Sequence, residues 1–386
     1  MKSATAAAIV IAVALVTGWV ALPFGHAAAL ILRAGGSGGV LGTAARWDAR
    51  TVRARERSVA LPDGTIRVRI FSPVAGAARA ALLVSGVHPD GIDEPRLVDL
   101  ARELAATGVN VVTPDIPDLT RYELTARVTD QIEHTAEWLA AEPDLSGRGR
   151  IGMIGVSFSG GLSIVAAGRE PLRSRVAYVL SFGGHGNLPR VLKYLCTGVE
   201  PSPPGTVGAA RPPHDYALAV LLHQAATLVV PAEQVADLRR GIDGFIRASA
   251  LVRVDHERAT ALLRQNQLFE AQLPQPSATL MKFVNQRNVV GLGAYLLPFL
   301  PQLGQDVALS PDRSPAPAAP VYLLHGIDDN VIPAAESELL ARHLATHTHV
   351  RTLVSAFLTH VDVSERPSLP ETWRMISFWA GALGER

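Results

Sequence analysis

A serine flanked by small residues follows an apolar run near the middle of the chain. Residues 155–161 (GVSFSGG) join a predicted strand to a predicted helix with the sequence LSIVAAGRE. A sharp strand-to-helix turn would lift the Ser157 hydroxyl clear of a sheet, and small neighbours relieve the crowding in such a turn. The N-terminus of the following helix offers backbone N–H groups that stabilise an oxyanion. The pattern therefore predicts Ser157 as a nucleophile.

One position departs from the G-x-S-x-G pattern of such turns. The fifth residue is Ser159 instead of glycine, although Gly160 and Gly161 keep the turn open. Ser159 is the alternative nucleophile, but it lies further into the helix and has no glycine two residues before it. A glycine-rich connection without catalytic function would show the same residues, because short motifs recur by chance.

Two later loops offer an acid and a base. Residues 325–333 (HGIDDNVIP) follow an apolar strand and contain Asp329, with Asp328 as the alternative. His360 ends the segment FLTH after the last predicted strand. A neutral histidine can take the serine proton while a carboxylate fixes its tautomer. Ser157, Asp329 and His360 occur in the order nucleophile, acid, histidine, so we predict that they form a triad.

An earlier loop, residues 85–91 (SGVHPDG), follows the strand at 80–86. A glycine at position 86 would allow the backbone to approach a substrate closely. We predict that the backbone N–H groups of Val87 and Phe158 form the oxyanion hole. For His88, contact with substrate and a structural role in the loop both remain open.

Alternating strand and helix patterns position these loops. After a hairpin at 57–61 and 66–71, short apolar runs predict buried strands at 80–86, 109–115, 150–157, 176–184, 321–326 and 350–356. Helical patterns cover 95–107, 122–141, 334–345 and 370–383. This alternation predicts an α/β fold with a mostly parallel sheet flanked by helices.

A long stretch between Gly184 and Val321 interrupts the alternation. It contains helical patterns at 217–230, 232–249, 255–271 and 279–297 between proline-rich breaks. So long a loop without structure is improbable in a compact domain, so we interpret residues 186–314 as a helical lid insertion. The core would then comprise residues 57–185 and 315–386, preceded by a linker at 35–56 that contains the flexible segment GGSGGVLG.

The N-terminal segment, residues 1–34, is strongly apolar. Residues 6–22 carry no charge, and the apolar run resumes after Pro23 and ends at Leu32. Its length is near that of a spanning helix and exceeds a usual signal-peptide core. We predict membrane association through residues 6–32, or export if the segment is cleaved. The arginines that follow favour the cytoplasmic side for an anchor. An apolar helix packed on the domain is the alternative.

Composition excludes several classes of partner. Lys and Arg number 36 against 35 acidic residues, a balance that argues against nucleic acid. Cys196 is the only cysteine, so neither an internal disulfide nor a thiolate metal site can form. His343, His347 and His349 lack an H-E-x-x-H pattern, and no phosphate-loop pattern occurs, so we expect neither metal nor cofactor.

The motifs GVSFSGG, HGIDDNVIP and FLTH resemble the nucleophile elbow, acid loop and histidine loop of the α/β-hydrolase superfamily. The resemblance covers roughly residues 57–386. The loop sequences GVHPDG and HGIDDNVIP are most similar to those of the dienelactone-hydrolase and prolyl-oligopeptidase-like branches. It implies hydrolysis of carboxylic esters through an acyl-enzyme without a cofactor, and the apolar lid suggests a small-molecule ester with an apolar acyl group. A serine peptidase and a membrane-tethered, non-catalytic binding protein are the alternatives.

Overall fold

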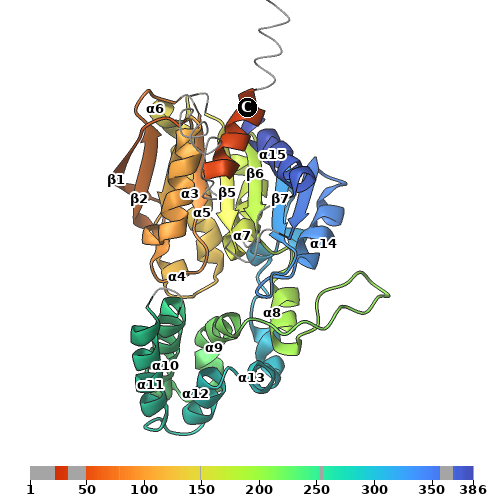
Figure 1. The fold of residues 1–386 in the computed structure, drawn as a ribbon. Helices are drawn as coiled ribbons and strands as arrows, with labels where there is room; N and C mark the ends of the chain where they lie inside the picture. Colours follow the sequence, from red (N-terminus) through yellow and green to blue (C-terminus); the bar gives the residue numbers. More distant parts are fainter. Residues whose placement is uncertain are drawn as a thin grey trace, which may run out of the picture.

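The computed structural model describes residues 22–33, 49–77, 79–147, 149–252, 255–356 and 368–385. Its centre is an eight-stranded sheet with the order β1-β2-β4-β3-β5-β6-β7-β8 (Figure 1). Among these strands β2 alone runs against the others. The strands are β1 (Val52–Leu61), β2 (Gly64–Pro73), β3 (Ala80–Val84), β4 (Asn110–Pro114), β5 (Ile151–Val156), β6 (Val176–Phe182), β7 (Val321–Gly326) and β8 (Val350–Ser355).

The predicted N-terminal hairpin is confirmed, with longer strands than the sequence indicated. Strands β1 and β2 pair antiparallel along their whole length, and Leu61 lies opposite Gly64. Gly64 has a φ of 128°, a conformation that L side chains rarely adopt. The turn at 62–64 thus depends on the glycine.

Helices cover both faces of the sheet. Helices α5 (Ala126–Ala141), α7 (Phe158–Gly168) and α14 (Ala335–Leu344) share a buried apolar cluster with Leu82, Met153 and Leu323 on one face. Helices α3 (Pro95–Ala106) and α15 (Leu369–Gly384) pack with Leu83, Ile154 and Leu324 on the other. A mostly parallel sheet flanked in this way fits the α/β-hydrolase fold that the sequence resembles.

Two predicted helices are wrong in their bounds. The helix predicted at 122–141 begins only at Ala126, because a short helix α4 (Pro117–Thr120) precedes it and Tyr122 has a φ of 62°. The helix predicted at 279–297 is divided into α12 (Ser277–Asn285) and α13 (Val289–Leu296), because Arg287 has a φ of 51°. A positive φ cannot continue a right-handed helix, and neither residue type signals one in the sequence.

The stretch between β6 and β7 is helical, as predicted. It contains α9 (Asp215–Val229), α10 (Ala232–Leu251) and α11 (His256–Glu270) besides α12 and α13. A helix that the sequence pattern does not predict, α8 (Leu188–Thr197), precedes them. The Asn187 side chain caps its N-terminus by accepting a hydrogen bond from the Arg190 N–H. Figure 1 shows α9–α13 as a group beside the sheet domain. That these helices act as a lid, and the domain bounds given above, stay predictions.

The second half of the apolar N-terminal segment packs on the domain. Residues 22–33 are helical, and Ala27 and Leu30 are buried in one cluster with α3 and α15. The ring of Phe24 stacks on Trp373, with centroids 5.8 Å apart. None of the helices in the described ranges is long and apolar enough to cross a membrane. Residues 6–21 and the linker segment 35–42 lie outside those ranges, so the anchor remains a prediction.

Candidate functional site

Ser157 lies between the end of β5 and the start of α7. Its backbone has φ 56° and ψ −135°, a combination that costs a non-glycine residue roughly 1–3 kcal/mol. The Ser157 N–H donates to the Phe182 carbonyl on neighbouring β6 at 2.7 Å, and its carbonyl accepts from the Gly160 N–H at 2.8 Å. The predicted strand–turn–helix is therefore present, and strain is concentrated at the predicted nucleophile.

Small residues make this turn sterically feasible. A Cβ on Gly155 would lie 2.2 Å from the Ser159 carbonyl oxygen, and one on Gly160 would lie 2.3 Å from Ser181 Oγ. Beneath α7, a Cβ on Gly161 would meet the ring of His185 at 2.6 Å. Each position therefore excludes a larger residue, which explains the glycines that the sequence motif contains.

The alternative nucleophile, Ser159, has a structural role. Its side chain is fully buried, and Oγ donates to the Ser85 carbonyl at 2.6 Å. This hydrogen bond joins α7 to the loop after β3. The geometry favours Ser157 over Ser159, because a nucleophile must reach a substrate.

The loop after β3 lies directly against the turn. A Cβ on Gly86 would be 3.3 Å from Ser157 Cβ, so the backbone passes the serine at van der Waals distance. Val87 and Phe158 are both buried. Neither backbone N–H donates to an acceptor among the described residues. Phe158 directly follows Ser157, and Val87 follows Gly86, whose backbone passes the serine. The assignment of these two N–H groups to an oxyanion hole remains a prediction.

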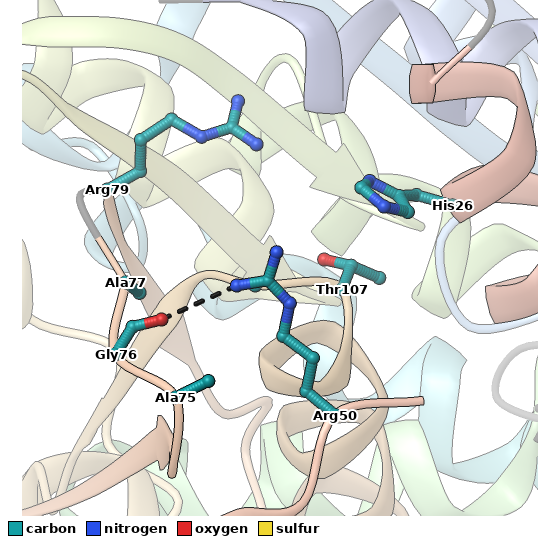
Figure 2. Close-up of a pocket in the computed structure, with 8 residues that line it drawn as sticks. His26, Arg50, Ala75, Gly76, Ala77, Arg79 and Thr107 are labelled. Carbon is teal, nitrogen blue, oxygen red and sulfur yellow. Dashed lines mark hydrogen bonds between the residues drawn. The ribbon is translucent and has the colours of Figure 1, made fainter. Parts of the chain in front are cut away.

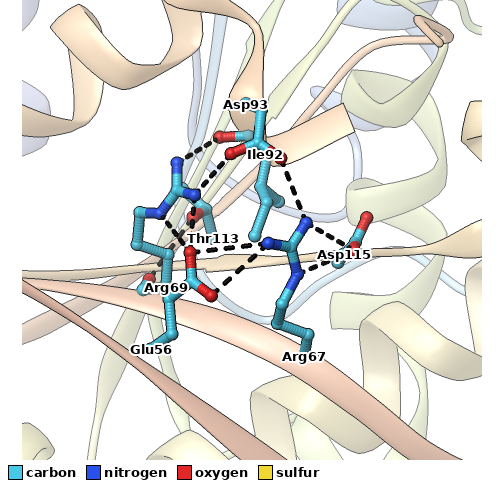
Figure 3. A network of polar contacts seen from close by, with 7 residues as sticks. All are labelled: Glu56, Arg67, Arg69, Ile92, Asp93, Thr113 and Asp115. Carbon is cyan, nitrogen blue, oxygen red and sulfur yellow. Dashed lines mark hydrogen bonds and ion pairs between the residues drawn. The ribbon is translucent and has the colours of Figure 1, made fainter. Parts of the chain in front are cut away.

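An ionic network fixes the far end of this loop (Figure 3). Arg67 and Arg69 on β2 both pair with Asp93, and Arg69 Nη1 donates to the Ile92 carbonyl at 3.0 Å. Arg67 also pairs with Asp115 after β4, at 3.0 Å. The Arg69 guanidinium, hydrogen-bonded to Asp93, lowers the pKa of that carboxyl. Exposed pairs contribute little to stability singly, but this network ties the loop that contains Gly86 and Val87 to the sheet.

Asp329 is buried in the loop after β7, with 1% of its surface exposed. Its Oδ1 accepts the N–H groups of Val331 and Ile332, each at 2.9 Å. A Cβ on Gly183, just after β6, would lie 3.5 Å from Asp329 Oδ2. The carboxylate therefore lies over the end of β6, beside the strand that carries Ser157.

Asp328 is in a different environment. Its side chain is 70% exposed and pairs with Arg211 at 3.1 Å. A carboxylate that orients a catalytic histidine must be held in one position away from bulk water. The geometry therefore favours Asp329 over Asp328.

His325 supports the loop that contains Asp329. The sequence pattern predicts no role for this histidine. It is fully buried; Nδ1 is 2.7 Å from Ser337 Oγ, and Nε2 is 2.7 Å from the Ile332 carbonyl. Because a carbonyl can only accept, Nε2 donates to the Ile332 carbonyl. Nε2 also lies 3.4 Å from Asp329 Oδ2. His325 directly precedes Gly326 in the segment HGIDDNVIP, at the end of a predicted strand. This position is the sequence feature that could have indicated a role in the loop.

His360 lies outside the described residues, which stop at Ala356 after β8 and resume at Ser368. The end of β8 is beside the acid loop, because the Ile327 N–H donates to the Ser355 carbonyl at 3.0 Å. Ala356 and His360 are four residues apart (360 − 356), which an extended chain spans in about 14 Å at most. The role of His360 stays a prediction.

The helical insertion contacts both loops of the candidate site. From α9, Tyr216 Oη donates to the Val87 carbonyl at 2.8 Å. The His214 N–H donates to the Asn330 carbonyl at 2.8 Å, and Tyr194 Oη donates to the same carbonyl at 3.2 Å. Nothing in the residue pattern of the insertion predicts these contacts, since they join segments more than a hundred residues apart.

Structural surroundings account for four other histidines of the described residues. His185 is fully buried, its Nε2 is 2.8 Å from the Leu309 carbonyl, and burial lowers its pKa. Burial also lowers the pKa of His88, whose Nδ1 accepts the Asp90 N–H at 3.2 Å. His343 and His347 stack on each other at the end of α14. Within the described ranges, no group of three or more histidine, cysteine or acidic residues could hold a metal ion.

No family model and no curated protein matches this sequence. Solved structures with a similar fold include an esterase from Pyrococcus furiosus, at 14% identity and a TM-score of 0.46, with 86% of this chain and 90% of that one covered. A thermostable esterase from Pseudomonas putida shares 13% identity at a TM-score of 0.46, covering 93% and 96%. An acylaminoacyl peptidase from Pyrococcus horikoshii shares 14% at a TM-score of 0.43; 86% of this chain spans 41% of that one. Similarities this distant carry no conclusion about activity, so the function has to be argued from the site.

Proposed function

We propose that this protein is a serine hydrolase that cleaves carboxylic esters through an acyl-enzyme at Ser157. The observation that carries the proposal is the strained backbone of Ser157 at the carboxyl end of β5, with φ 56° and ψ −135°. Strain of this kind persists only where the surrounding structure enforces it, and it gathers at functional sites. The buried, backbone-oriented Asp329 at the same edge of the sheet supports the proposal.

The proposed reaction has two halves. His360 takes the Ser157 proton while Oγ attacks the ester carbonyl, and the resulting oxyanion accepts hydrogen bonds from the N–H groups of Val87 and Phe158. His360 then gives its proton to the leaving alcohol, which leaves an acyl group on Ser157. Water, deprotonated by His360, attacks that acyl group, and His360 returns the proton to Ser157 Oγ as the acid is released.

Within this mechanism Asp329 orients the histidine. Its Oδ1 is engaged by the N–H groups of Val331 and Ile332, so we assign Oδ2 to the imidazole of His360. The carboxylate would fix the tautomer and stabilise the imidazolium that forms during attack. The Oδ1 bonds hold the carboxylate rigid for this purpose.

The insertion would act as a lid over an apolar acyl group. Ser157 is only 8% exposed. Tyr216 on α9 lies within hydrogen-bonding distance of the oxyanion loop, and α9 is lined with buried Leu218, Leu221 and Leu222. We therefore expect α9 to border the acyl group, and substrate entry to require a displacement of α9 from the loop.

A fluorophosphonate probe tests the nucleophile. We expect it to label the wild type and Ser159→Ala but not Ser157→Ala, because Ser157 is the proposed nucleophile and the Ser159 hydroxyl is buried and donates to the Ser85 carbonyl. Ser159→Ala is the matched control: it removes the same hydroxyl two residues away. Equal labelling of wild type and Ser157→Ala would refute the proposal, as would loss of labelling in a folded Ser159→Ala.

Substrate class is tested separately. Nitrophenyl esters of increasing acyl length should be hydrolysed by the wild type and not by Ser157→Ala, with a preference for apolar chains. Cleavage of aminoacyl anilides at rates comparable to esters would replace the esterase assignment by a peptidase. Absence of both activities from a protein that the probe does not label would favour a non-catalytic protein.

A further inference from the structure

Ser157 and Asp329 follow the carboxyl ends of β5 and β7, at one edge of the sheet. A pocket of about 540 Å³ lies at the other edge, at the amino ends of the parallel strands (Figure 2). It is lined by residues that precede β1, β3 and β4 or follow β2, among them Arg50, whose Nη1 donates to the Gly76 carbonyl at 3.4 Å. Further groups that act on the predicted triad therefore have to come from the carboxyl edge, where the helical insertion contacts both loops of the candidate site.

Tyr194 on α8 contacts the loop that contains Asp329. Its side chain is buried, and Oη donates to the Asn330 carbonyl at 3.2 Å. Burial raises the pKa of the Tyr194 hydroxyl, and the negative charges of Glu200 and Asp329 raise it further, so the hydroxyl keeps its proton and remains a donor. The His214 N–H donates to the same carbonyl at 2.8 Å. Two donors of the insertion thus converge on one carbonyl oxygen of this loop.

That carbonyl belongs to the peptide group that holds the Asp329 carboxylate. The Asn330 carbonyl and the Val331 N–H are the two ends of one planar amide, and this N–H donates to Asp329 Oδ1 at 2.9 Å. Donors on the carbonyl fix the plane of the amide and polarise it, which strengthens its N–H as a donor. A chain of hydrogen bonds therefore connects Tyr194 to Asp329 through a single peptide group.

The second N–H on Asp329 Oδ1 is supported from the sheet domain. It belongs to Ile332, and the Ile332 carbonyl accepts from His325 Nε2 at 2.7 Å. His325 lies on β7 itself. One hydrogen bond to the carboxylate thus depends on the core, and the other depends on the insertion.

We propose that Tyr194 is a positioning residue for the reaction at Ser157, because it holds the Asp329 carboxylate in the orientation that His360 requires. This inference rests on the proposed function. It makes the insertion part of the machinery that orients the triad, in addition to a cover over the acyl group. Tyr194→Phe keeps the aromatic ring and leaves the Asn330 carbonyl with the His214 N–H, so we expect the variant to fold.

Steady-state kinetics on a nitrophenyl ester test the proposal. Tyr194→Phe should lower kcat about fivefold while KM changes less than about twofold, because one neutral hydrogen bond is lost and no substrate contact is removed. In the Asp329→Ala background, the same substitution should change the residual kcat less than about twofold, because no carboxylate remains to be positioned. A purely structural role of Tyr194 would lower the activity by the same factor in both backgrounds.

Tyr295→Phe is the matched control. It removes a hydroxyl from α13, where the ring of Tyr295 stacks on Phe299, and should leave kcat and KM unchanged. An equal loss in this control would show a general effect of the insertion and overturn the role of Tyr194. An unchanged kcat in Tyr194→Phe, equal losses in the two Asp329 backgrounds, or a change confined to KM would each overturn it as well.

Urea unfolding provides the same comparison without a substrate. Tyr194→Phe should raise the unfolding equilibrium constant about fivefold in the wild type and by a smaller factor in Asp329→Ala, because both side chains act on one peptide group. Equal factors would overturn the inference. A wild type that neither hydrolyses esters nor reacts with the fluorophosphonate probe would overturn the proposed function instead, and the unfolding data would still decide whether Tyr194 is coupled to Asp329.

Discussion

Replacing Ser157 by glycine and by alanine separates the strain at this residue from its chemistry. Both variants remove the hydroxyl and every contact it makes, but only glycine adopts φ 56° and ψ −135° without steric cost. Relief of strain should contribute roughly 1–3 kcal/mol to the folded state. The greater freedom of glycine in the unfolded chain costs about 0.5–1 kcal/mol. We therefore expect Ser157→Gly to be more stable than Ser157→Ala by about 1 kcal/mol, with both inactive.

Urea unfolding followed by circular dichroism measures this difference. The same two substitutions at Ser163, inside α7, provide a control in which the stability difference should have the opposite sign. Ser163 is fully buried in a regular helix. There the glycine variant should be less stable than the alanine variant by about 0.5–1 kcal/mol. Equal stability of the two Ser157 variants would show that the turn is unstrained, and the argument for Ser157 would then lose its main support.

Three further predictions concern the loops and the insertion. Asp329→Asn should lower kcat for ester hydrolysis about 10³-fold or more, whereas Asp328→Asn should leave it nearly unchanged. Tyr216→Phe should lower kcat by about threefold to tenfold with a smaller effect on KM, because one neutral hydrogen bond to the Val87 carbonyl is lost. Burial lowers the pKa of His223 to about 4, so the folded state resists its protonation; stability should fall as the pH drops from about 6.5 towards 4.

Each of these predictions has its own check. Steady-state kinetics on a nitrophenyl ester compare the two aspartate variants; similar losses in both would contradict the assignment of Asp329. For Tyr216→Phe, an unchanged kcat would show that the contact has no positioning role. For His223, urea unfolding at several pH values compares the wild type with His223→Gln. The free energy of unfolding of His223→Gln should rise relative to that of the wild type as the pH falls. Parallel pH profiles would refute the lowered pKa of His223.

Local sequence patterns were sufficient for the strands and for the order of the site loops. Apolar runs of five to seven residues mark β3–β7 because strands buried on both faces expose no polar side. Local patterns failed where one residue changes the backbone direction. Tyr122 and Arg287 adopt positive φ values that their residue types do not signal, so the sequence pattern predicts continuous helices around them.

The choice between neighbouring candidates depended on tertiary contacts. Asp328 and Asp329 are identical in type and adjacent in sequence, yet one pairs with Arg211 on the surface and the other is buried under the N–H groups of its own loop. Ser157 and Ser159 differ in the same way, since Ser159 is engaged by the Ser85 carbonyl. Burial and hydrogen-bond partners are properties of the folded chain, and residue type does not specify them.

The sequence by itself determined the class of fold, the turn at Ser157 and the order of the predicted triad, because these depend on residue spacing along single strands and turns. Only the tertiary structure distinguished the environments of the neighbouring serines and aspartates and showed that α9 contacts the loop after β3. The physical reason is that these arrangements join segments that are far apart in the chain, and sheet pairing and side-chain packing, not local pattern, bring them together.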